Sequence, residues 1–372
     1  MKRLLFIKQE ILPKGGLEKY ARNLVQAFIK QGCEVTILSA TPNIPSFEGA
    51  KVVYLPLYGL LGFHRLLRWD TITQAYVEKH SFDVVFSLDR VTCPTYLRTG
   101  NGVHASYLKH RQEGLFKRLS FRINPLHRTL LRLEKNLFSS PKLKKIIVNS
   151  RMVRQELEEF YHVDSSRIAI HHNGVEWKEL QTPFDQWELT KAAVCDELSL
   201  PEENFLFLFV GHHYRRKGLG LILHSFSMLK EGHLLIAGKD REIPYYKKLA
   251  QDLNLKNRVS FLGPRHDITR LYAVADALVV PSLYDPFANV TVEALAMGLF
   301  VVSSPFNGGK EILTSSSGTI IEDLLDSDSV KNAFNEALLH PKTAQSATAI
   351  RNHYASLDFS IHLPKLVQEC LM

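Results

Sequence analysis

Short apolar runs alternate with helical patterns along this chain, and the alternation starts a second time in its second half. The first part has apolar runs at Leu4–Ile7 and Glu34–Leu38, with one helical face between them at residues 17–29. The second part begins at Phe205–Val210 and continues to Phe300–Ser303. Short apolar runs separated by helices are typical of buried strands in a parallel sheet. The pattern therefore predicts two doubly wound α/β domains.

The length favours two domains over one, because 372 residues is about 2.5 times a usual domain length of ~150. The polar, irregular stretch Trp177–Asn204 separates the two alternating parts, so we place the domains at 1–175 and 176–355. Two such domains usually hold a ligand in the cleft between them, at the carboxyl ends of the strands. The other predicted strands are Val52–Leu55, Val84–Ser87, Lys145–Val148, Ile168–His171, His233–Ala237, Val259–Leu262 and Ala277–Val280.

Composition excludes several classes of protein. A hydrophobic content of 45% and a charged content of 23% are globular values, which excludes wholesale disorder. The apolar run at Leu4–Ile7 ends at Lys8, too early for a signal peptide, and no run approaches the length of a membrane span. We therefore expect a soluble cytoplasmic protein. The cysteines lack zinc or disulfide spacing: Cys33, Cys93, Cys195 and Cys370.

The positive charge is concentrated in one segment. The net charge is +8, and eleven Lys or Arg residues but two Glu residues lie between Lys109 and Lys145. Such a segment suits nucleic acid, phosphorylated small molecules or anionic lipid. In a second helix, opened by Pro125, we expect the leucines to pack on the domain. In the first, apolar and basic residues are interleaved, which predicts contact with an anionic membrane through Lys109, Arg111, Leu115, Phe116, Lys117, Arg118, Phe121 and Arg122.

Two glycine and cation motifs lie where strands end. Gly15-Gly16 stands between the first strand and its helix, where glycines let an anion approach the helix N-terminus, although such a pair is often structural. No GxGxxG fingerprint is present, which disfavours a dinucleotide-dependent dehydrogenase. Arg215, Arg216 and Lys217 follow the strand that ends at Val210 and suit a diphosphate, the alternative being a solvated loop.

Two carboxylates mark a strand–loop–helix junction in the second part. Glu293 lies in a helix of otherwise apolar residues, and an unpartnered buried charge is costly, so it needs a partner. The vicinal hydroxyls of a ribose would serve. Asp285, eight residues earlier, could accept hydrogen bonds from the hydroxyls of a sugar at the helix N-terminus. The alternative for both is an ordinary cap or surface acid.

Taken in order, these motifs resemble the retaining glycosyltransferases of family 4. The resemblance rests on Gly15-Gly16, Arg216-Lys217, the run Val259–Gly263, and the Asp285/Glu293 pair followed by Gly308-Gly309-Lys310-Glu311. Asn149-Ser150 ahead of His172-Asn173-Gly174-Val175 is similar to another junction of the family. The marks span residues 15 to 311. They imply the GT-B fold: two Rossmann-like, doubly wound domains facing across a cleft, with a C-terminal helix at about 356–372 that crosses back to the first domain.

The resemblance also implies roles for individual residues. Arg216 and Lys217 would hold the donor diphosphate, Glu293 the ribose and Asp285 the donor sugar. His104, in the first domain, matches a family histidine beside the reacting centre, which implies a catalytic role for it together with Asp285, Arg216 and Lys217. The donor-binding set comprises Gly15, Gly16, Arg216, Lys217, Gly263, Pro264, Arg265, Asp285, Ala288, Asn289, Val290 and Glu293.

The sequence departs from the family pattern in two places. Asp285 is one methylene shorter than the first Glu of the family's E-x7-E, and Ala288 replaces a glycine, so the donor or the rate could differ. The implied reaction retains the anomeric configuration, with front-face attack by the acceptor and the leaving phosphate as base. The resemblance implies no metal cofactor. Asp326-Ser327-Asp328 looks like a metal-binding DxD, but we interpret it as a helix cap.

Within the family, the first helix start, the basic segment and the approach to Asn149-Ser150 are similar to enzymes that glucosylate the lipopolysaccharide core. This implies UDP-glucose as donor, a lipid-linked inner-core saccharide as acceptor, and a peripheral position on the cytoplasmic membrane face. Alternatives are a family 4 enzyme using GDP-mannose or UDP-N-acetylglucosamine, a GT-B epimerase, or a basic nucleic-acid or membrane-binding protein. The segment lacks aromatic stacking platforms and RRM, KH or zinc signatures, which disfavours nucleic acid.

Overall fold

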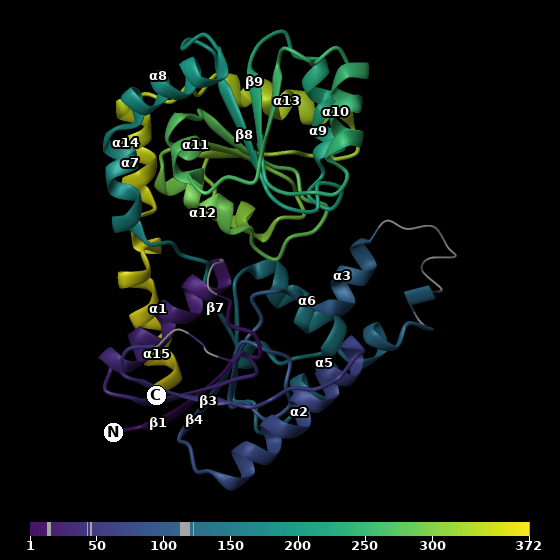
Figure 1. Ribbon diagram of the computed structural model, residues 1–372, viewed down its shortest axis with the longest axis vertical. Coiled ribbons are helices and arrows are strands. Elements are labelled where there is room, and N and C mark those ends of the chain that lie inside the picture. Colours follow the sequence, from purple (N-terminus) through teal and green to yellow (C-terminus); the bar gives the residue numbers. More distant parts are fainter. Residues whose placement is uncertain (13–15, 43, 45–46, 112–119, 122, 372) are drawn as a thin grey trace. The chain divides into compact units, whose positions relative to one another are not determined.

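The computed structural model describes residues 1–12, 16–42, 44, 47–111, 120–121 and 123–371, apart from the side chain of Leu17. The chain divides into two compact units (Figure 1). Unit 1 comprises Met1–His172 and Ser360–Met372, and unit 2 comprises Asn173–Phe359. The two units are described separately below.

Unit 1 contains a seven-stranded parallel sheet, in the order β3-β2-β1-β4-β5-β6-β7. Its central strands are buried on both faces, as the continuous apolar runs predict. The strands are β1 (Arg3–Ile7), β2 (Glu34–Ser39), β3 (Ala50–Tyr54), β4 (Val84–Ser87), β5 (Tyr96–Arg98), β6 (Lys145–Val148) and β7 (Ile168–Ile170).

Helices cover this sheet and include the C-terminal one. Trp69 of α2 packs into a cluster with Leu5 and Ile7 of β1, and Leu137 of α5 packs with Ile146 of β6. These contacts confirm that the leucine side of α5 packs on its own domain. The helices are α1 (Gly16–Lys30), α2 (Gly62–Lys79), α3 (His104–His110), α5 (Pro125–Phe138), α6 (Arg151–Tyr161) and α15 (Phe359–Leu371).

Unit 2 contains a six-stranded parallel sheet, in the order β10-β9-β8-β11-β12-β13. Alternate residues of β8 face two separate cores: Leu206 and Leu208 pack on one side, Phe207 and Phe209 on the other. The strands are β8 (Leu206–Val210), β9 (His233–Ala237), β10 (Val259–Gly263), β11 (Ala277–Val280), β12 (Phe300–Ser303) and β13 (Gly318–Ile320).

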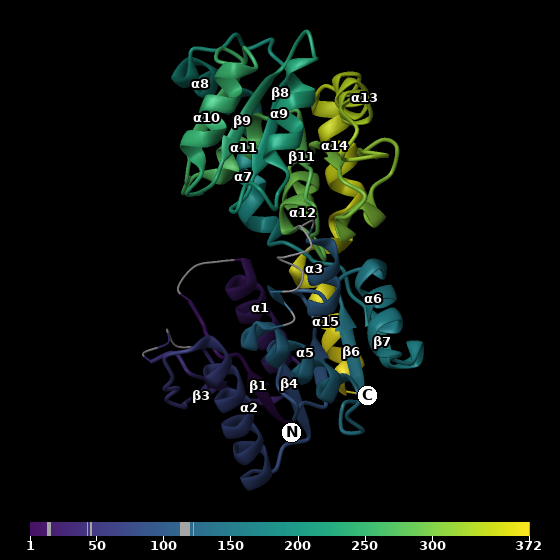
Figure 2. The same cartoon turned by 90° about the vertical axis from the view of Figure 1, so that its right-hand side faces the viewer.

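The helices of unit 2 lie on both faces of its sheet (Figure 2). They are α7 (Gln181–Asp185), α8 (Trp187–Leu198), α9 (Leu219–Ser227), α10 (Ile243–Asp252), α11 (Ile268–Val274), α12 (Asn289–Ala296), α13 (Ser327–Leu338) and α14 (Ala344–His353). The expectation of an irregular stretch at Trp177–Asn204 was wrong, because most of it forms α7 and α8. Val194 and Cys195 of α8 are buried against α11, and this tertiary packing supplies what the weak local pattern lacked.

The division between the units falls a few residues from the predicted boundaries of 175/176 and 355/356. Asn173 donates its side-chain amide to Phe287 O at 3.1 Å. Val175 N donates to Leu357 O, and Phe359 N donates to Val175 O. Both crossing segments are therefore hydrogen-bonded within unit 2. Beyond them, α15 bonds to unit 1: Glu369 lies 2.6 Å from His171 Nε2 and 3.5 Å from Lys145 Nζ.

Two parallel-sheet Rossmann-like domains are thus present, as the sequence predicts. In the part of the chain that the structure describes, no helix combines the length and the apolar character needed to cross a bilayer.

Candidate functional site

The loop after β8 is fixed close to the loop after β11. Gly218 has a φ of +76°, and a Cβ there would collide with the carbonyl oxygen of Pro281, so only glycine permits this approach. Leu283 N donates to Arg216 O at 3.0 Å across the two loops. Tyr214 N donates to Asp240 at 2.6 Å, which anchors the other side of the first loop. The carboxyl ends of two neighbouring strands therefore present their loops together.

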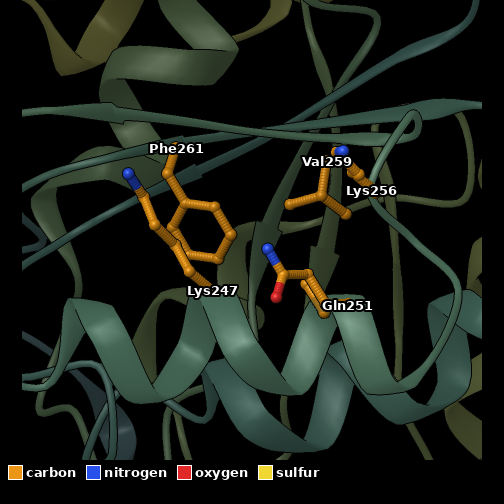
Figure 3. A pocket seen from close by; sticks show the side chains of 6 residues that line it. Lys247, Gln251, Lys256, Val259 and Phe261 are labelled. Atoms are coloured by element: carbon orange, nitrogen blue, oxygen red, sulfur yellow. The ribbon is translucent and has the colours of Figure 1, made fainter.

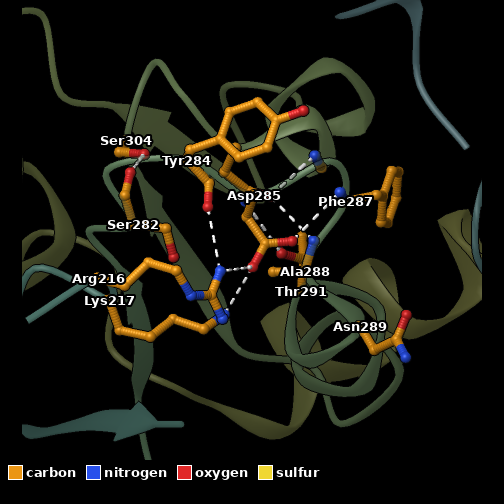
Figure 4. A network of polar contacts seen from close by, with 12 residues as sticks. Arg216, Lys217, Ser282, Tyr284, Asp285, Phe287, Ala288, Asn289, Thr291 and Ser304 are labelled. Carbon is orange, nitrogen blue, oxygen red and sulfur yellow. Dashed lines mark hydrogen bonds and ion pairs between the residues drawn. The ribbon is translucent and has the colours of Figure 1, made fainter. Parts of the chain in front are cut away.

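This arrangement brings Arg216, Lys217 and Asp285 into one cluster (Figure 4). Lys217 Nζ lies 2.7 Å from Asp285 Oδ2, and Arg216 Nη1 lies 3.7 Å from the same oxygen. Arg216 also donates to Tyr284 O at 3.2 Å. Two cations surround one carboxylate, so the cluster carries a net positive charge. The Lys217 and Asp285 side chains are 13% and 12% exposed, which leaves their attraction only partly screened by water.

A buried asparagine, Asn307, braces the Asp285 loop. Asn307 Oδ1 accepts from Ala288 N at 3.0 Å and from Gly309 N at 3.1 Å. Asp285 N donates to Phe306 O, and Gly308 N donates to Asp285 O, each at 2.9 Å. Sequence analysis missed Asn307, although it stands directly before the glycine pair of the 308–311 motif. The bracing fixes the position of the Asp285 carboxylate at the start of α12.

Glu293 has the partner that its apolar helix requires. Its Oε2 accepts a hydrogen bond from the hydroxyl of Tyr272, a fully buried residue of α11, at 2.6 Å. Burial and the neighbouring carboxylate raise the pKa of Tyr272 well above its ordinary value, so the phenol stays protonated and donates. Glu293 itself is half-buried, and its carboxylate is held by α11.

Three residues of the predicted donor-binding set, Gly263, Pro264 and Arg265, lie at the carboxyl end of β10. Gly263 has a φ of +67°, and its carbonyl accepts from Gly238 N at 2.8 Å. Arg265 is bound by Asp267 at 2.7 Å and by Glu197 at 3.3 Å, so its side chain is engaged within unit 2. Pro264 and Asn289 are exposed, and Val290 is half-buried.

A cavity of about 240 Å³ lies between α10 and the edge strand β10 (Figure 3). Phe261 and Val259 form its apolar side, and Lys247 and Lys256 flank it. None of the predicted donor residues lines this cavity.

In unit 1, His104 begins α3 and belongs to a buried polar network. Its Nε2 lies 3.0 Å from His127 Nδ1 of α5, and its backbone N donates to Glu134 Oε1 at 2.8 Å. The buried Glu134 also accepts from Arg90 at 2.7 Å and from Tyr161 at 2.7 Å. Sequence analysis missed these partners; an acid among the leucines and arginines of α5 is the signal that could have found Glu134. The network fixes the orientation of His104.

Burial, followed by the charges of Arg90 and His127, lowers the pKa of His104 to about 4. Burial likewise lowers the pKa of His233, on β9, to about 4. Both imidazoles are therefore neutral at pH 7, with His233 Nε2 lying 2.9 Å from Ser260 Oγ.

Acidification from pH 6.5 to pH 4 is expected to destabilise the protein. In this range the unfolded chain binds protons at these two histidines and the native state does not, so the free energy of unfolding falls as the pH falls. Urea midpoints measured at pH 7 and pH 5 test this. His233→Gln should reduce the difference between them, because a glutamine amide does not titrate. The exposed His224→Gln is the control, and an equal effect of both substitutions would contradict the expectation.

The predicted membrane residues are described only in part. Leu115, Phe116, Lys117, Arg118 and Arg122, like Gly15 of the donor set, lie outside the described residues. Lys109 pairs with Glu159 at 2.7 Å. Arg111 lies over the rings of Tyr107 and Phe121, its guanidinium carbon 4.7 Å from the Phe121 centroid. Gly16 is exposed at the first position of α1.

The Asp326-Ser327-Asp328 motif forms a helix cap. Asp326 precedes α13, and its carboxylate accepts from Asp328 N and Ser329 N, each at 3.2 Å, which confirms the interpretation. Over the described ranges, no group of three or more His, Cys, Asp or Glu residues is arranged to hold a metal ion.

The family models and the similar proteins found by comparison are all glycosyltransferases. Residues 14–178 match the Glycosyltransferase Family 4 domain, and residues 193–352 match the Glycosyl transferases group 1 domain. An uncharacterised glycosyltransferase of Methanocaldococcus jannaschii is 24% identical over 318 residues, which is 80% of this chain and 79% of that protein. The lipopolysaccharide glucosyltransferase WaaG of Escherichia coli K12 is 20% identical over 366 residues, 97% of this chain and 96% of that protein.

Solved structures share the fold. The crystal structure of WaaG superimposes with a TM-score of 0.76, at 18% identity and 98% coverage of both chains. The Anabaena protein HepE in complex with UDP-glucose superimposes with a TM-score of 0.69 at 17% identity, over 100% of this chain and 99% of that one. At these identities the likeness establishes the two-domain architecture, and the chemistry has to be argued from the residues.

Proposed function

Because the chain belongs to the family 4 glycosyltransferases of GT-B fold, we propose that it transfers glucose from UDP-glucose to a lipid-linked saccharide with retention of anomeric configuration. The acceptor we propose is the inner core of a lipopolysaccharide, at the cytoplasmic face of the membrane. The observation that carries the donor half of this proposal is the Arg216–Lys217–Asp285 cluster. The relationship to WaaG over nearly the whole chain supports glucose and lipopolysaccharide.

The cluster has the chemistry that a sugar diphosphate needs. Lys217 offers a compact point charge, and Arg216 offers a planar fork that matches phosphate oxygens. Asp285 holds both cations at one place before any donor arrives. When the diphosphate binds, its oxygens form ion pairs with Arg216 and Lys217. The Asp285 carboxylate then becomes available to accept hydrogen bonds from the sugar hydroxyls. Glu293, fixed by Tyr272, accepts from the ribose hydroxyls.

The same cations promote departure of the nucleotide. As the bond between the anomeric carbon and the diphosphate oxygen breaks, negative charge develops on that oxygen, and positive charge develops on the anomeric carbon. Preorganised cations stabilise such developing charge without having to reorganise. The acceptor hydroxyl then attacks from the face the nucleotide leaves, and its proton passes to the departing phosphate. In this proposal no metal is required.

His104 is the residue of unit 1 that we place beside the reacting centre. Its low pKa keeps it neutral, so it hydrogen-bonds to a sugar without adding charge. The bond to His127 and the backbone bond to Glu134 hold the ring in one orientation. Such restraint is what positioning of a substrate hydroxyl requires.

Thermal unfolding with a panel of nucleotide sugars tests the donor. UDP-glucose at about 100 times its dissociation constant should stabilise the native state by ~2.7 kcal/mol, a shift of several degrees. The double variant Arg216→Ala/Lys217→Ala should lose this shift. Lys248→Ala, which removes an exposed lysine from α10, is the matched control and should keep it.

The panel also separates the alternatives. A shift with GDP-mannose or UDP-N-acetylglucosamine in place of UDP-glucose would retain a family 4 transferase and contradict glucose as the sugar. A UDP-glucose shift that is equal in the wild type and the double variant would contradict the role of the Arg216–Lys217–Asp285 cluster.

A further inference from the structure

An exposed apolar turn connects β3 to α2 in unit 1. Leu60 is 103% exposed, Tyr58 is 66% exposed and Leu61 is 51% exposed. Single exposed hydrophobic residues are ordinary on protein surfaces, whereas three within four positions of one turn are not. Sequence analysis gave this segment no role. We refer to residues 58–61 as the apolar turn.

Local structure holds the apolar turn outward. Gly59 has a φ of +154°, a conformation that side-chain-bearing residues rarely adopt, and a Cβ there would lie 3.0 Å from Arg65 Cγ. Arg65 pairs with Glu10 at 2.9 Å, and the Arg68 guanidinium carbon lies 5.6 Å from the Tyr58 ring centroid. The Arg68–Tyr58 contact thus joins the turn to α2, while Leu60 contributes nothing to the core.

The N-cap position of α2 is occupied by a leucine, which stabilises a helix N-terminus poorly. Leu61 occupies the N-cap and makes no capping hydrogen bond. Ser, Thr, Asp or Asn at this position would satisfy an amide of the first turn, and Leu is among the poorest residues for it. An exposed leucine where a polar residue would stabilise the helix indicates that the apolar side chain serves another purpose.

The apolar turn adjoins the start of α5, which lies within the basic segment of residues 109–145. A Cβ at Gly62 would lie 3.6 Å from Leu126 Cδ1, and Ile123, just before α5, is 69% exposed. Helix α2 contributes Arg65, which pairs with Glu10, and Arg68. Arg128 and Arg132 are exposed on α5. Apolar side chains and the exposed cations of α5 therefore share this part of unit 1.

We propose that the apolar turn inserts into an anionic lipid surface, with the arginines of α2 and α5 binding lipid headgroups around it. This rests on the proposed function, which places the enzyme at a membrane, and adds the element that enters the bilayer. Leucines at a tip with a tyrosine and arginines beside them match an interfacial site, where long cationic side chains reach headgroups while their stems stay apolar. A protein partner would need acidic groups to face the arginines of α2 and α5, whereas anionic lipid supplies negative charge over the whole surface.

An environment-sensitive dye on a cysteine at position 60 tests the insertion. The four native cysteines are buried and free, so Leu60→Cys provides an accessible thiol for labelling. On adding phosphatidylglycerol vesicles, the dye emission should shift to the blue. The control Ala75→Cys lies on the exposed side of α2, about 20 Å further along the helix. Its emission should not change. Bound protein in which position 60 stays in water would overturn the proposal.

A second variant separates membrane binding from folding. Leu60→Ser/Leu61→Ser gains an N-cap, so its unfolding temperature should equal or exceed that of the wild type. Its partition onto phosphatidylglycerol vesicles should fall about tenfold or more, because two apolar side chains no longer leave water. Leu189→Ser/Leu339→Ser, which replaces two exposed leucines of unit 2, should bind as the wild type does. Equal losses in both double variants would overturn the proposal.

The donor measurement keeps this proposal distinct from the proposed function. Leu60→Ser/Leu61→Ser should keep the full thermal shift with UDP-glucose. If the wild type binds vesicles through position 60 but shows no shift with any nucleotide sugar, the donor proposal fails and the insertion stands. If the donor shift is present and the wild type does not bind vesicles, the insertion fails and the donor proposal stands.

Discussion

Replacing Lys217 with alanine is expected to lower kcat/KM for sugar transfer by about 10²–10³-fold, the usual cost of removing one group that stabilises developing charge. Lys217 is the closer of the two cations to Asp285, at 2.7 Å, and its side chain is largely withdrawn from water. In the variant, Arg216 alone would offset the negative charges of Asp285 and the diphosphate. Steady-state release of UDP in the presence of acceptor measures the effect.

Loss of folding has to be separated from loss of chemistry in this variant. Lys217→Ala leaves the Asp285 carboxylate buried with Arg216 at 3.7 Å as its remaining charged neighbour, and such a charge is destabilising. Lys217→Met/Asp285→Asn removes both charges, so its unfolding temperature should recover while transfer stays low. If transfer recovers together with stability, Lys217 is a structural residue and the mechanism above is wrong.

Glu293→Gln is expected to raise the dissociation constant of UDP by about 10–100-fold. A hydrogen bond to a charged acceptor contributes ~1.5–3 kcal/mol, and the glutamine can still accept from Tyr272. The variant therefore keeps the contact between α11 and α12 and loses the charge offered to the ribose. Isothermal titration of UDP measures the change directly.

Tyr272→Phe is the matched variant for that experiment. It removes the hydroxyl that holds Glu293 but leaves the carboxylate, so the protein should be less stable and UDP affinity should fall by less than in Glu293→Gln. Equal affinities for UDP in the wild type and Glu293→Gln would mean that Glu293 serves as the partner of Tyr272 and does not bind ribose.

Most of the fold could be predicted because parallel strands buried on both faces are continuous apolar runs. Lys145–Val148, His233–Ala237 and Phe300–Ser303 have the predicted bounds. The strands β5 and β13 were missed, since each has three residues and neither has the apolar run of the equally short β7. The helix α8 was missed because its apolar residues do not form one clear stripe along it, and its burial comes from packing against α11.

The site could be predicted only to the level of single positions. Sequence motifs identified Arg216, Lys217 and Asp285 as site residues. The cations were assigned to the diphosphate and the carboxylate to the sugar, so their contact with each other was not predicted. The need of Glu293 for a partner followed from its apolar helix, whereas the identity of Tyr272 depends on how α11 packs. His127 acts through its contact with His104, and Asn307 braces the Asp285 loop through Ala288 N, so no local pattern identifies these two roles.

The exposure of apolar residues also could not be predicted from local sequence. In sequence, Leu60 and Leu61 are indistinguishable from Leu66 and other leucines of the same segment. Their exposure depends on the path of the turn between β3 and α2, where Gly59 has a positive φ and Arg68 lies against Tyr58. The expected membrane contact was therefore placed at residues 109–122 alone, and the apolar turn was found only in the structure.

The most direct measurement is an NMR analysis of the product formed from isotope-labelled UDP-glucose and lipopolysaccharide that ends at its inner core. We expect one UDP released per glucose transferred, and an anomeric signal showing that the new glycoside has the same α configuration as the donor. A β-glycoside, or labelled glucose found free in water with none on the acceptor, would contradict the account.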